Sequence, residues 1–178
     1  EVKDIDHIIF SGMGGSGSIG DVISSILSKE DIHVTIVKGY QLPSNLNSKS
    51  LVVTTSVSGN TSEALGILNA VKKTSAKVVS FSSGGNVETF CHENEIFYQK
   101  IPTIHSPRAS YTSFLYSILN ILEPILPINK TDIFESISLL KKTRESIFSD
   151  NLSENNQSLK LAKFIKDVVC IFYPAGLQ

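Results

Sequence analysis

The chain has 178 residues, of which 41% are hydrophobic and 19% charged, and its formal net charge at pH 7 is −1. This apolar content is enough for one sizeable core, and the lack of a long basic run argues against binding to nucleic acid or to a membrane surface, since both need clustered Lys and Arg. The longest apolar stretch, Phe114 to Ile128, is interrupted by Asn, Glu and Pro, so it is too broken to span a bilayer.

Five short apolar runs have the length and composition of buried parallel strands. They are His7 to Ser11, His33 to Lys38, Ser50 to Ser56, Lys77 to Ser83 and Ile96 to Ile101. Helical patterns lie between several of these runs, and such alternation is typical of a doubly wound α/β fold. The sequence therefore predicts a three-layer αβα sandwich around a five-stranded parallel sheet, similar to flavodoxin and Rossmann folds.

The first run leads into a glycine-rich loop, Gly12-Met13-Gly14-Gly15-Ser16-Gly17, and then into a helical pattern from Gly17 to Leu27. A helix N-terminus has unpaired N–H groups and a partial positive charge, so it can hold a phosphate without a dedicated cation. Glycines let the backbone approach such a ligand closely, and hydroxyls supply further donors. The loop is therefore a candidate phosphate cradle.

A second loop of the same kind follows the third run. Ser56-Val57-Ser58-Gly59-Asn60-Thr61 leads into a helical pattern from Thr61 to Lys73. Ligands of open α/β sheets bind at the carboxyl ends of the parallel strands, where both loops would lie. We therefore expect the two loops to form one pocket. The alternative is an ordinary turn in which Thr61 caps the helix and Glu63 is a first-turn charge.

After Pro107 the pattern is helical, with helices expected over Ala109 to Leu122, Thr131 to Phe148 and Ser158 to Lys166. The polar segment Ser149 to Gln157 is expected to be a connector. The run Asp167 to Gly176 resembles Asp6 to Gly14 in layout. We expect an α/β domain over residues 1–128, a helical segment with its connector over 129–166, and the first strand of a truncated second repeat over 167–178.

The chain starts without Met at Glu1 and stops at Gln178, so both ends are interpreted as cut. Cys91 and Cys170 have no CxxC partner, which favours reduced thiols in a cytoplasmic protein, and no signal peptide is visible. The histidines do not have the paired spacing of a metal site, and neither a metal nor another cofactor is predicted. They are His7, His33, His92 and His105.

Four short motifs follow one another along the chain, and Gly20-Asp21 comes after the first. They are GMGGSG at Gly12 to Gly17, SVSGNT at Ser56 to Thr61, SSGG at Ser82 to Gly85 and PRAS at Pro107 to Ser110. Together they resemble the first of the two sugar isomerase (SIS) domains of archaeal-type bifunctional phosphoglucose/phosphomannose isomerases. The resemblance extends from Ile5 to about Ile125. It implies a homodimeric, metal-independent enzyme of glycolysis and gluconeogenesis that acts on sugar phosphates.

The family reaction interconverts glucose 6-phosphate or mannose 6-phosphate with fructose 6-phosphate through a cis-enediolate. The resemblance implies that hydroxyls hold the phosphate, that two glycines let the backbone approach the sugar, and that one guanidinium faces the reacting carbons. These residues are, respectively, Ser16, Ser56, Ser58 and Thr61; Gly14 and Gly15; and Arg108. Val57 stands where relatives usually have Tyr, and we expect its side chain to point away from the ligand.

In that family the catalytic Glu and a His that acts on the ring lie in the second domain, and no residue here matches them. The resemblance therefore implies that this chain supplies the phosphate-binding half. His105 could help to open the ring. Asp21 is expected to be a helix-dipole partner or a solvated charge, and Glu63 could be either a helix-dipole partner or a base. Two alternatives stay open: a non-catalytic phosphosugar-binding module, and an NADP-dependent oxidoreductase that uses Gly12, Gly14 and Gly17 as a GxGxxG motif, with Lys38 where NAD enzymes have an acid.

Overall fold

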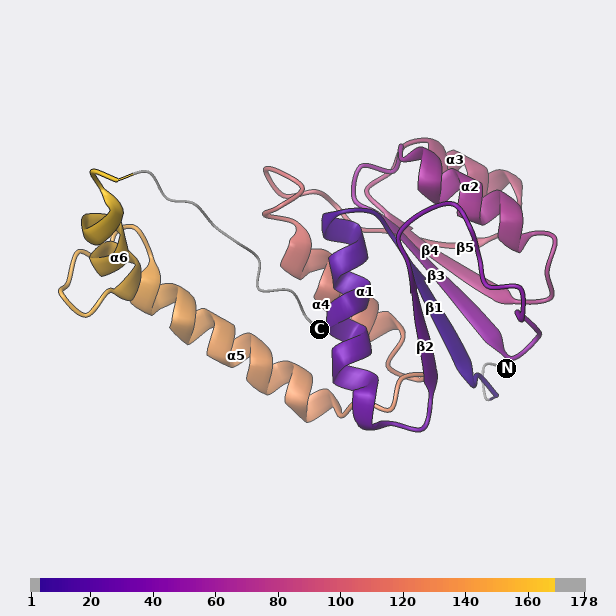
Figure 1. Cartoon of the computed structure of the whole chain (residues 1–178), viewed down its shortest axis with the longest axis horizontal. Coiled ribbons are helices and arrows are strands. Elements are labelled where there is room, and N and C mark those ends of the chain that lie inside the picture. The colour runs from indigo at the N-terminus through magenta and orange to yellow at the C-terminus, as the bar shows by residue number, and fades with distance from the viewer. Residues whose placement is uncertain (1–3, 169–178) are drawn as a thin grey trace. The chain divides into compact units, whose positions relative to one another are not determined.

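A computed structural model describes residues 4–168 of the chain (Figure 1). Five strands form one sheet in the order β2-β1-β3-β4-β5, and every neighbouring pair is parallel. The strands are β1 (His7–Ser11), β2 (His33–Val37), β3 (Ser50–Ser56), β4 (Lys77–Ser82) and β5 (Phe97–Lys100). The predicted five-stranded parallel sheet is confirmed.

Helices cover both faces of the sheet, with α1 beside α4 on one face and α2 beside α3 on the other (Figure 1). Their bounds are α1 (Gly15–Ile26), α2 (Ser62–Val71), α3 (Gly85–Glu93) and α4 (Tyr111–Ile121). A 3₁₀ turn, η1 (Leu27–Lys29), follows α1. The expected αβα sandwich is thus observed, and α3 is added to the helices expected from the sequence.

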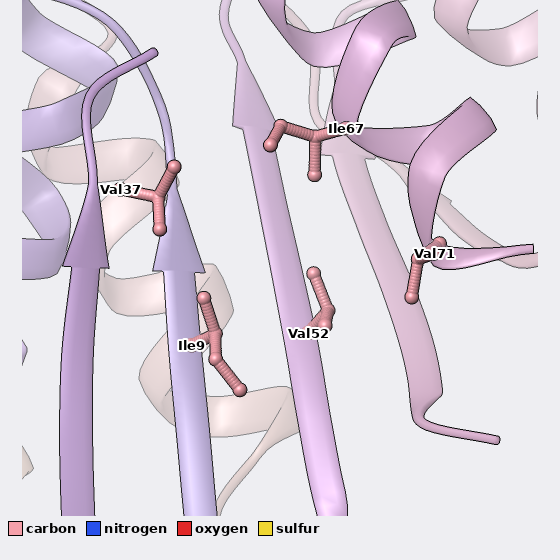
Figure 2. Packing of buried hydrophobic residues seen from close by; sticks show 5 residues of the cluster. All are labelled: Ile9, Val37, Val52, Ile67 and Val71. Carbon is pink, nitrogen blue, oxygen red and sulfur yellow. The ribbon is translucent and has the colours of Figure 1, made fainter. Parts of the chain in front are cut away.

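The two central strands are buried along their whole length, because helices cover both of their faces. On the α2 face, five side chains from β1, β2, β3 and α2 pack into one cluster (Figure 2): Ile9, Val37, Val52, Ile67 and Val71. On the other face, Gly20 lets α1 approach β1 closely, since a Cβ at this position would lie 2.8 Å from Cβ of Phe10. This packing places the start of α1 over the end of β1.

The chain divides into two compact units, Glu1–Ile128 and Asn129–Gln178. In the second unit, α5 (Lys130–Ile147) and α6 (Gln157–Ile165) have no buried side chain. The expected connector between them ends at Asn156, which is buried and caps α6 by accepting a hydrogen bond from Leu159 N. The strand expected over 167–178 falls almost wholly on residues 169–178, which lie outside the described residues.

Cys91 is a free, buried thiol on α3, packed with Ala64, Leu68 and Val87. Burial raises the pKa of this thiol, so Cys91 is a small hydrophobic residue of the core and a poor nucleophile. Cys170 lies outside the described residues.

His7 gives the fold a predictable pH dependence. Its Nε2 lies 2.8 Å from Oγ1 of Thr35, and its ring centroid lies 4.4 Å from that of His33. Burial, and then the charge of His33, lower the pKa of His7, whereas Asp6 acts in the opposite direction. The folded state thus disfavours the protonated ring, so we expect stability to be lost as the pH falls below about 6.5, the ordinary value for His.

The pH effect can be measured as the urea midpoint at pH 7 and pH 5. His7→Gln should flatten this dependence, whereas His92→Gln, which changes an exposed histidine of α3, should leave it unchanged. An equal loss of stability in the wild type and in His7→Gln would contradict the assignment.

Candidate functional site

The two candidate loops begin side by side, because β1 and β3 are neighbours in the sheet and Ser11 pairs with Thr54. Residues 12–14 connect β1 to α1, and residues 57–61 connect β3 to α2. The backbone N–H of Val57 donates a hydrogen bond to Oγ of Ser16 at 3.3 Å. The expected meeting of the two loops is therefore observed.

A cavity of about 490 Å³ opens over the two loops, a volume in the usual range of small-molecule sites. It is lined by Met13, Gly15, Ser16, Val57, Ser58, Thr61, Pro107, Arg108 and Tyr111. The wall thus combines the glycine loop, the serine loop and the segment that leads into α4.

Hydroxyl oxygens in the loops accept hydrogen bonds from the backbone. Ser16 Oγ accepts from Val57 N, Ser58 Oγ accepts from Asn60 N at 3.3 Å, and Ser56 Oγ accepts from Gly59 N at 3.1 Å. A hydroxyl that already accepts an N–H keeps its own hydrogen for another acceptor. Ser16 and Ser58, which line the cavity, are therefore well suited to donate to an anion.

Both helices that start at the cavity begin without a side-chain cap. The N-cap of α1 is Gly14, with φ 55°, and the N-cap of α2 is Thr61, whose side chain makes no capping bond within the described chain. Instead, Oγ1 of Thr61 lies 3.0 Å from Oγ of Ser56. The two helix N-termini thus present their partial positive charge to the cavity, as anion-binding sites do.

The structure brings together most of the residues named from the sequence. Gly15, Ser16, Ser58, Thr61 and Arg108 line the cavity. The other two, Ser56 and Gly14, are not lining residues. Ser56 is 2% exposed, and its hydroxyl is hydrogen-bonded to Oγ1 of Thr61 and to the backbone N of Gly59. Gly14 forms the exposed turn before α1. Their roles toward a ligand stay predictions.

Val57 is a buried residue of the cavity wall. Its backbone N–H donates to Ser16 and so connects the serine loop to the glycine loop. That its side chain points away from a ligand stays a prediction.

The segment before α4 is fixed by a buried serine. Oγ of Ser110, which is fully buried, accepts from Ile104 N at 2.8 Å and donates to Ser106 O at 2.8 Å. This turn holds Pro107 and the exposed Arg108 at the cavity. His105, in the same turn with φ 57°, is not among the lining residues.

Sequence reasoning gave no site role to three residues of the wall, Met13, Pro107 and Tyr111. Tyr111 begins α4, and its hydroxyl donates to Ser18 O on α1 at 3.2 Å. Met13 was within reach of the sequence analysis because it lies inside the glycine loop. Tyr111 had no such signal, since only the packing of α4 beside α1 brings it to the cavity.

The charged residues near the first two helices are paired with other side chains. Lys38 Nζ lies 2.6 Å from Oδ2 of Asp21, with both side chains about half exposed. The pKa of Tyr40 is raised by desolvation and by Glu63, whose carboxylate accepts a hydrogen bond from the Tyr40 hydroxyl. Lys38 is thus paired with Asp21, and neither Asp21 nor Glu63 is among the residues that line the cavity.

Two further features of residues 4–168 bear on metal and membrane binding. No group of three or more His, Cys, Asp and Glu side chains comes together there in an arrangement that could hold a metal ion. Over the same residues, no helix has the length and apolar character needed to cross a membrane.

The fold and the paired loops define a sugar isomerase domain. Residues 1–121 match the family model of the SIS domain, and the chain belongs to this family. It is 29% identical over 180 residues to the bifunctional phosphoglucose/phosphomannose isomerase of Caldicellulosiruptor bescii, covering 97% of this chain and 52% of the relative. The resemblance inferred from the four motifs is thereby confirmed.

A relative with a different name is also similar. The chain is 28% identical over 178 residues to the D-glucosamine-6-phosphate 4-epimerase of Sulfolobus acidocaldarius, covering 99% of this chain and 54% of the relative. The chain therefore spans about half the length of these relatives. Among solved structures, tagatose-6-phosphate ketose/aldose isomerase from Escherichia coli matches with a TM-score of 0.57 and 18% identity, covering 83% of this chain and 47% of that one. This last match supports the fold.

Proposed function

We propose that the chain is the phosphate-binding half of a phosphosugar aldose–ketose isomerase. The substrates proposed are glucose 6-phosphate and mannose 6-phosphate, interconverted with fructose 6-phosphate through a cis-enediolate. The observation that supports this most directly is the meeting of two uncapped helix N-termini and the hydroxyls of Ser16, Ser58 and Thr61 around one cavity. A phosphate monoester is an anion with several acceptor oxygens, which matches the hydroxyls, the helix N-termini and the guanidinium present in the wall.

Arg108 is the proposed charge stabiliser in this reaction. Proton transfer between adjacent sugar carbons develops negative charge on the enediolate oxygens, and a guanidinium held at the cavity stabilises that charge as it forms. The turn fixed by Ser110 supplies the required preorganisation. The proposal assigns the base and the ring-opening group to residues that a second domain or subunit supplies.

The named relatives support the substrate class. The relative from Caldicellulosiruptor bescii is named a phosphoglucose/phosphomannose isomerase, and the one from Sulfolobus acidocaldarius is named for a hexosamine 6-phosphate. Both names contain a phosphorylated six-carbon sugar, and the second places the phosphate on carbon 6. A cytoplasmic homodimer is proposed with this function, from the family resemblance alone.

A second candidate function is a non-catalytic phosphosugar-binding module. It is favoured by one observation: the residues that line the cavity in the described structure include no carboxylate that could act as the base. Binding of sugar phosphate without turnover by this chain fits both candidates. Turnover after a second domain is supplied would favour the isomerase.

We expect this chain to bind fructose 6-phosphate, and Ser58→Ala to weaken the binding by roughly 10-fold or more, because a hydrogen bond to a charged group is lost. Calorimetric titration measures this effect. Ser62→Ala is the matched control, since Ser62 begins α2 but does not line the cavity. Binding of NADPH without any heat from fructose 6-phosphate would reject the proposal in favour of a dinucleotide site.

A further inference from the structure

The serine loop caps a neighbouring helix. Helix α3 begins after Gly84, which has no side chain with which to cap it. Its first-turn N–H groups donate to the serine loop instead: Val87 N to Gly59 O at 2.9 Å, and Asn86 N to Oδ1 of Asn60 at 3.0 Å. The loop that lines the cavity is therefore bonded directly to the start of α3.

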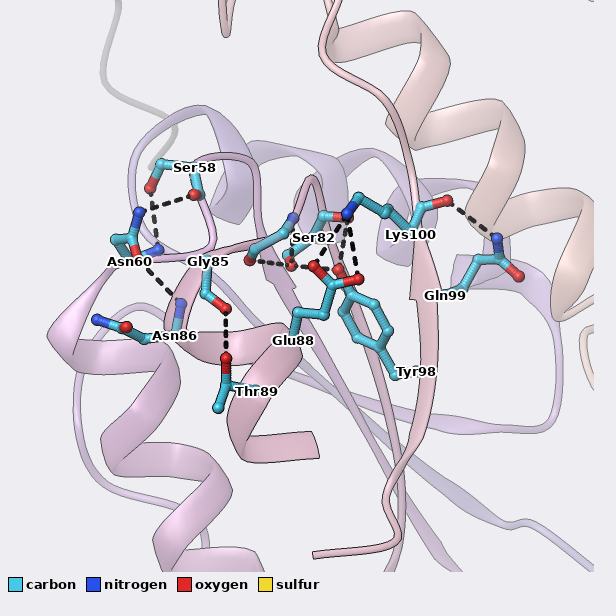
Figure 3. Close-up of polar contacts among 11 residues, drawn as sticks. Ser58, Asn60, Ser82, Gly85, Asn86, Glu88, Thr89, Tyr98, Gln99 and Lys100 are labelled. Atoms are coloured by element: carbon cyan, nitrogen blue, oxygen red, sulfur yellow. Dashed lines mark hydrogen bonds and ion pairs between the residues drawn. The ribbon is translucent and has the colours of Figure 1, made fainter. Parts of the chain in front are cut away.

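Asn60 connects this helix to Ser58 (Figure 3). Its Nδ2 donates to Ser58 O at 3.2 Å, while its backbone N donates to Oγ of Ser58 at 3.3 Å. The orientation of the amide is fixed by its partners, because the N–H of Asn86 needs an oxygen and the carbonyl of Ser58 needs an N–H. The amide of Asn60 thus holds the carbonyl of Ser58, whereas its backbone N–H holds the hydroxyl of Ser58.

The turn opposite Asn60 is rigidly supported. The hydroxyl of Ser82, which is fully buried, donates to Gly84 O at 2.9 Å and accepts from Gly84 N at 3.2 Å, and the hydroxyl of Tyr98 lies 2.9 Å from it. A Cβ on Gly85 would lie 2.5 Å from Oδ1 of Asn60, so the turn touches the amide directly. Ser82 of β4 and Tyr98 of β5 therefore hold the turn at Gly84 and Gly85 in place, and Asn60 packs against this turn (Figure 3).

We infer that Asn60 is a positioning residue for the phosphate cradle: its amide fixes the backbone of Ser58 to the start of α3, and the position of that backbone sets where the Ser58 hydroxyl lies. Asn60 itself is not among the residues that line the cavity. The inference rests on the proposed function, because it takes Ser58 as a donor to the sugar phosphate. A loop whose backbone is free to move must be ordered when the ligand binds, and this ordering weakens binding.

Asn60→Ala tests the inference, with Asn86→Ala as its matched control. The control removes an exposed amide side chain but keeps the backbone N–H that donates to Asn60. We expect Asn60→Ala to raise the Kd for inorganic phosphate and for fructose 6-phosphate about 10-fold, and the control to leave both unchanged. In the ligand-free chain, the amides of residues 86 and 87 should exchange hydrogen faster in Asn60→Ala only.

A double-mutant cycle separates positioning from general stability. If Asn60 acts through Ser58, Asn60→Ala should have little further effect on Kd in a Ser58→Ala background. Additive effects, or an unchanged Kd in Asn60→Ala, would overturn the positioning role. If the wild-type chain binds neither probe, the proposed function fails and the positioning role with it, while the exchange rates still report whether the contact between Asn60 and α3 exists.

Discussion

Gly59→Ala is expected to lower the free energy of unfolding by about 2–5 kcal/mol, by combining backbone strain with overpacking. Gly59 has φ 69°, a left-handed conformation that a Cβ disfavours. In addition, that Cβ would overlap the carbonyl of Gly84, which Ser82 holds in place. The serine loop would have to separate from α3, and urea unfolding followed by circular dichroism would record the loss.

Gly14→Ala is the matched control for this substitution. Gly14 has a similar φ of 55°, yet a Cβ there would meet nothing within 4 Å. The backbone of Gly14 (φ 55°, ψ −125°) is one that other residues rarely adopt, so only this conformational cost of about 1–3 kcal/mol should remain. Equal losses in the two variants would show that contact with Gly84 is unimportant and that backbone conformation alone requires glycine at residue 59.

Ser16→Asp is expected to weaken fructose 6-phosphate binding on the order of 100-fold or more, because a donor is replaced by a charge that repels the phosphate. The fold should tolerate the change. Ser16 lies in the first turn of α1, where a carboxylate favours the helix, and its oxygen can still accept from Val57 N. Ser16→Asp should therefore weaken sugar-phosphate binding without lowering the stability of the fold.

Calorimetry together with thermal unfolding tests this independence. Ser48→Asp introduces the same charge at an exposed position before β3, at the opposite edge of the sheet from the cavity, and should leave binding intact. If Ser16→Asp bound the sugar phosphate as tightly as Ser48→Asp does, the glycine loop would not be part of the anion site.

The strands could be predicted well because a strand buried on both faces is a nearly continuous apolar run in the sequence. His7–Ser11 and Ser50–Ser56 have the predicted bounds, since each apolar run stops where the loop begins. Helix α3 has no comparable apolar pattern. Only Val87 and Cys91 of its nine residues are buried, so its sequence lacks the apolar stripe by which an amphipathic helix is found.

The candidate site could be predicted as far as local sequence controls it. Ser16, Ser58 and Thr61 lie in loops whose glycines and hydroxyls stand out in the sequence, and they meet because β1 and β3 are adjacent. The burial of Ser56 below the loop and the place of Tyr111 in the wall depend on packing between distant segments. Such tertiary contacts leave no periodic pattern in the sequence.

The bond between Ser16 and Val57 joins residues 41 positions apart in the chain. Loops so distant in sequence come together only after β1 and β3 have paired, because the entropy of closing the intervening segment must be overcome first. The cradle is thus missing from any form in which these strands are separate. An anion bound there adds its binding free energy to the native state alone, so the ligand would also protect the chain from proteolysis.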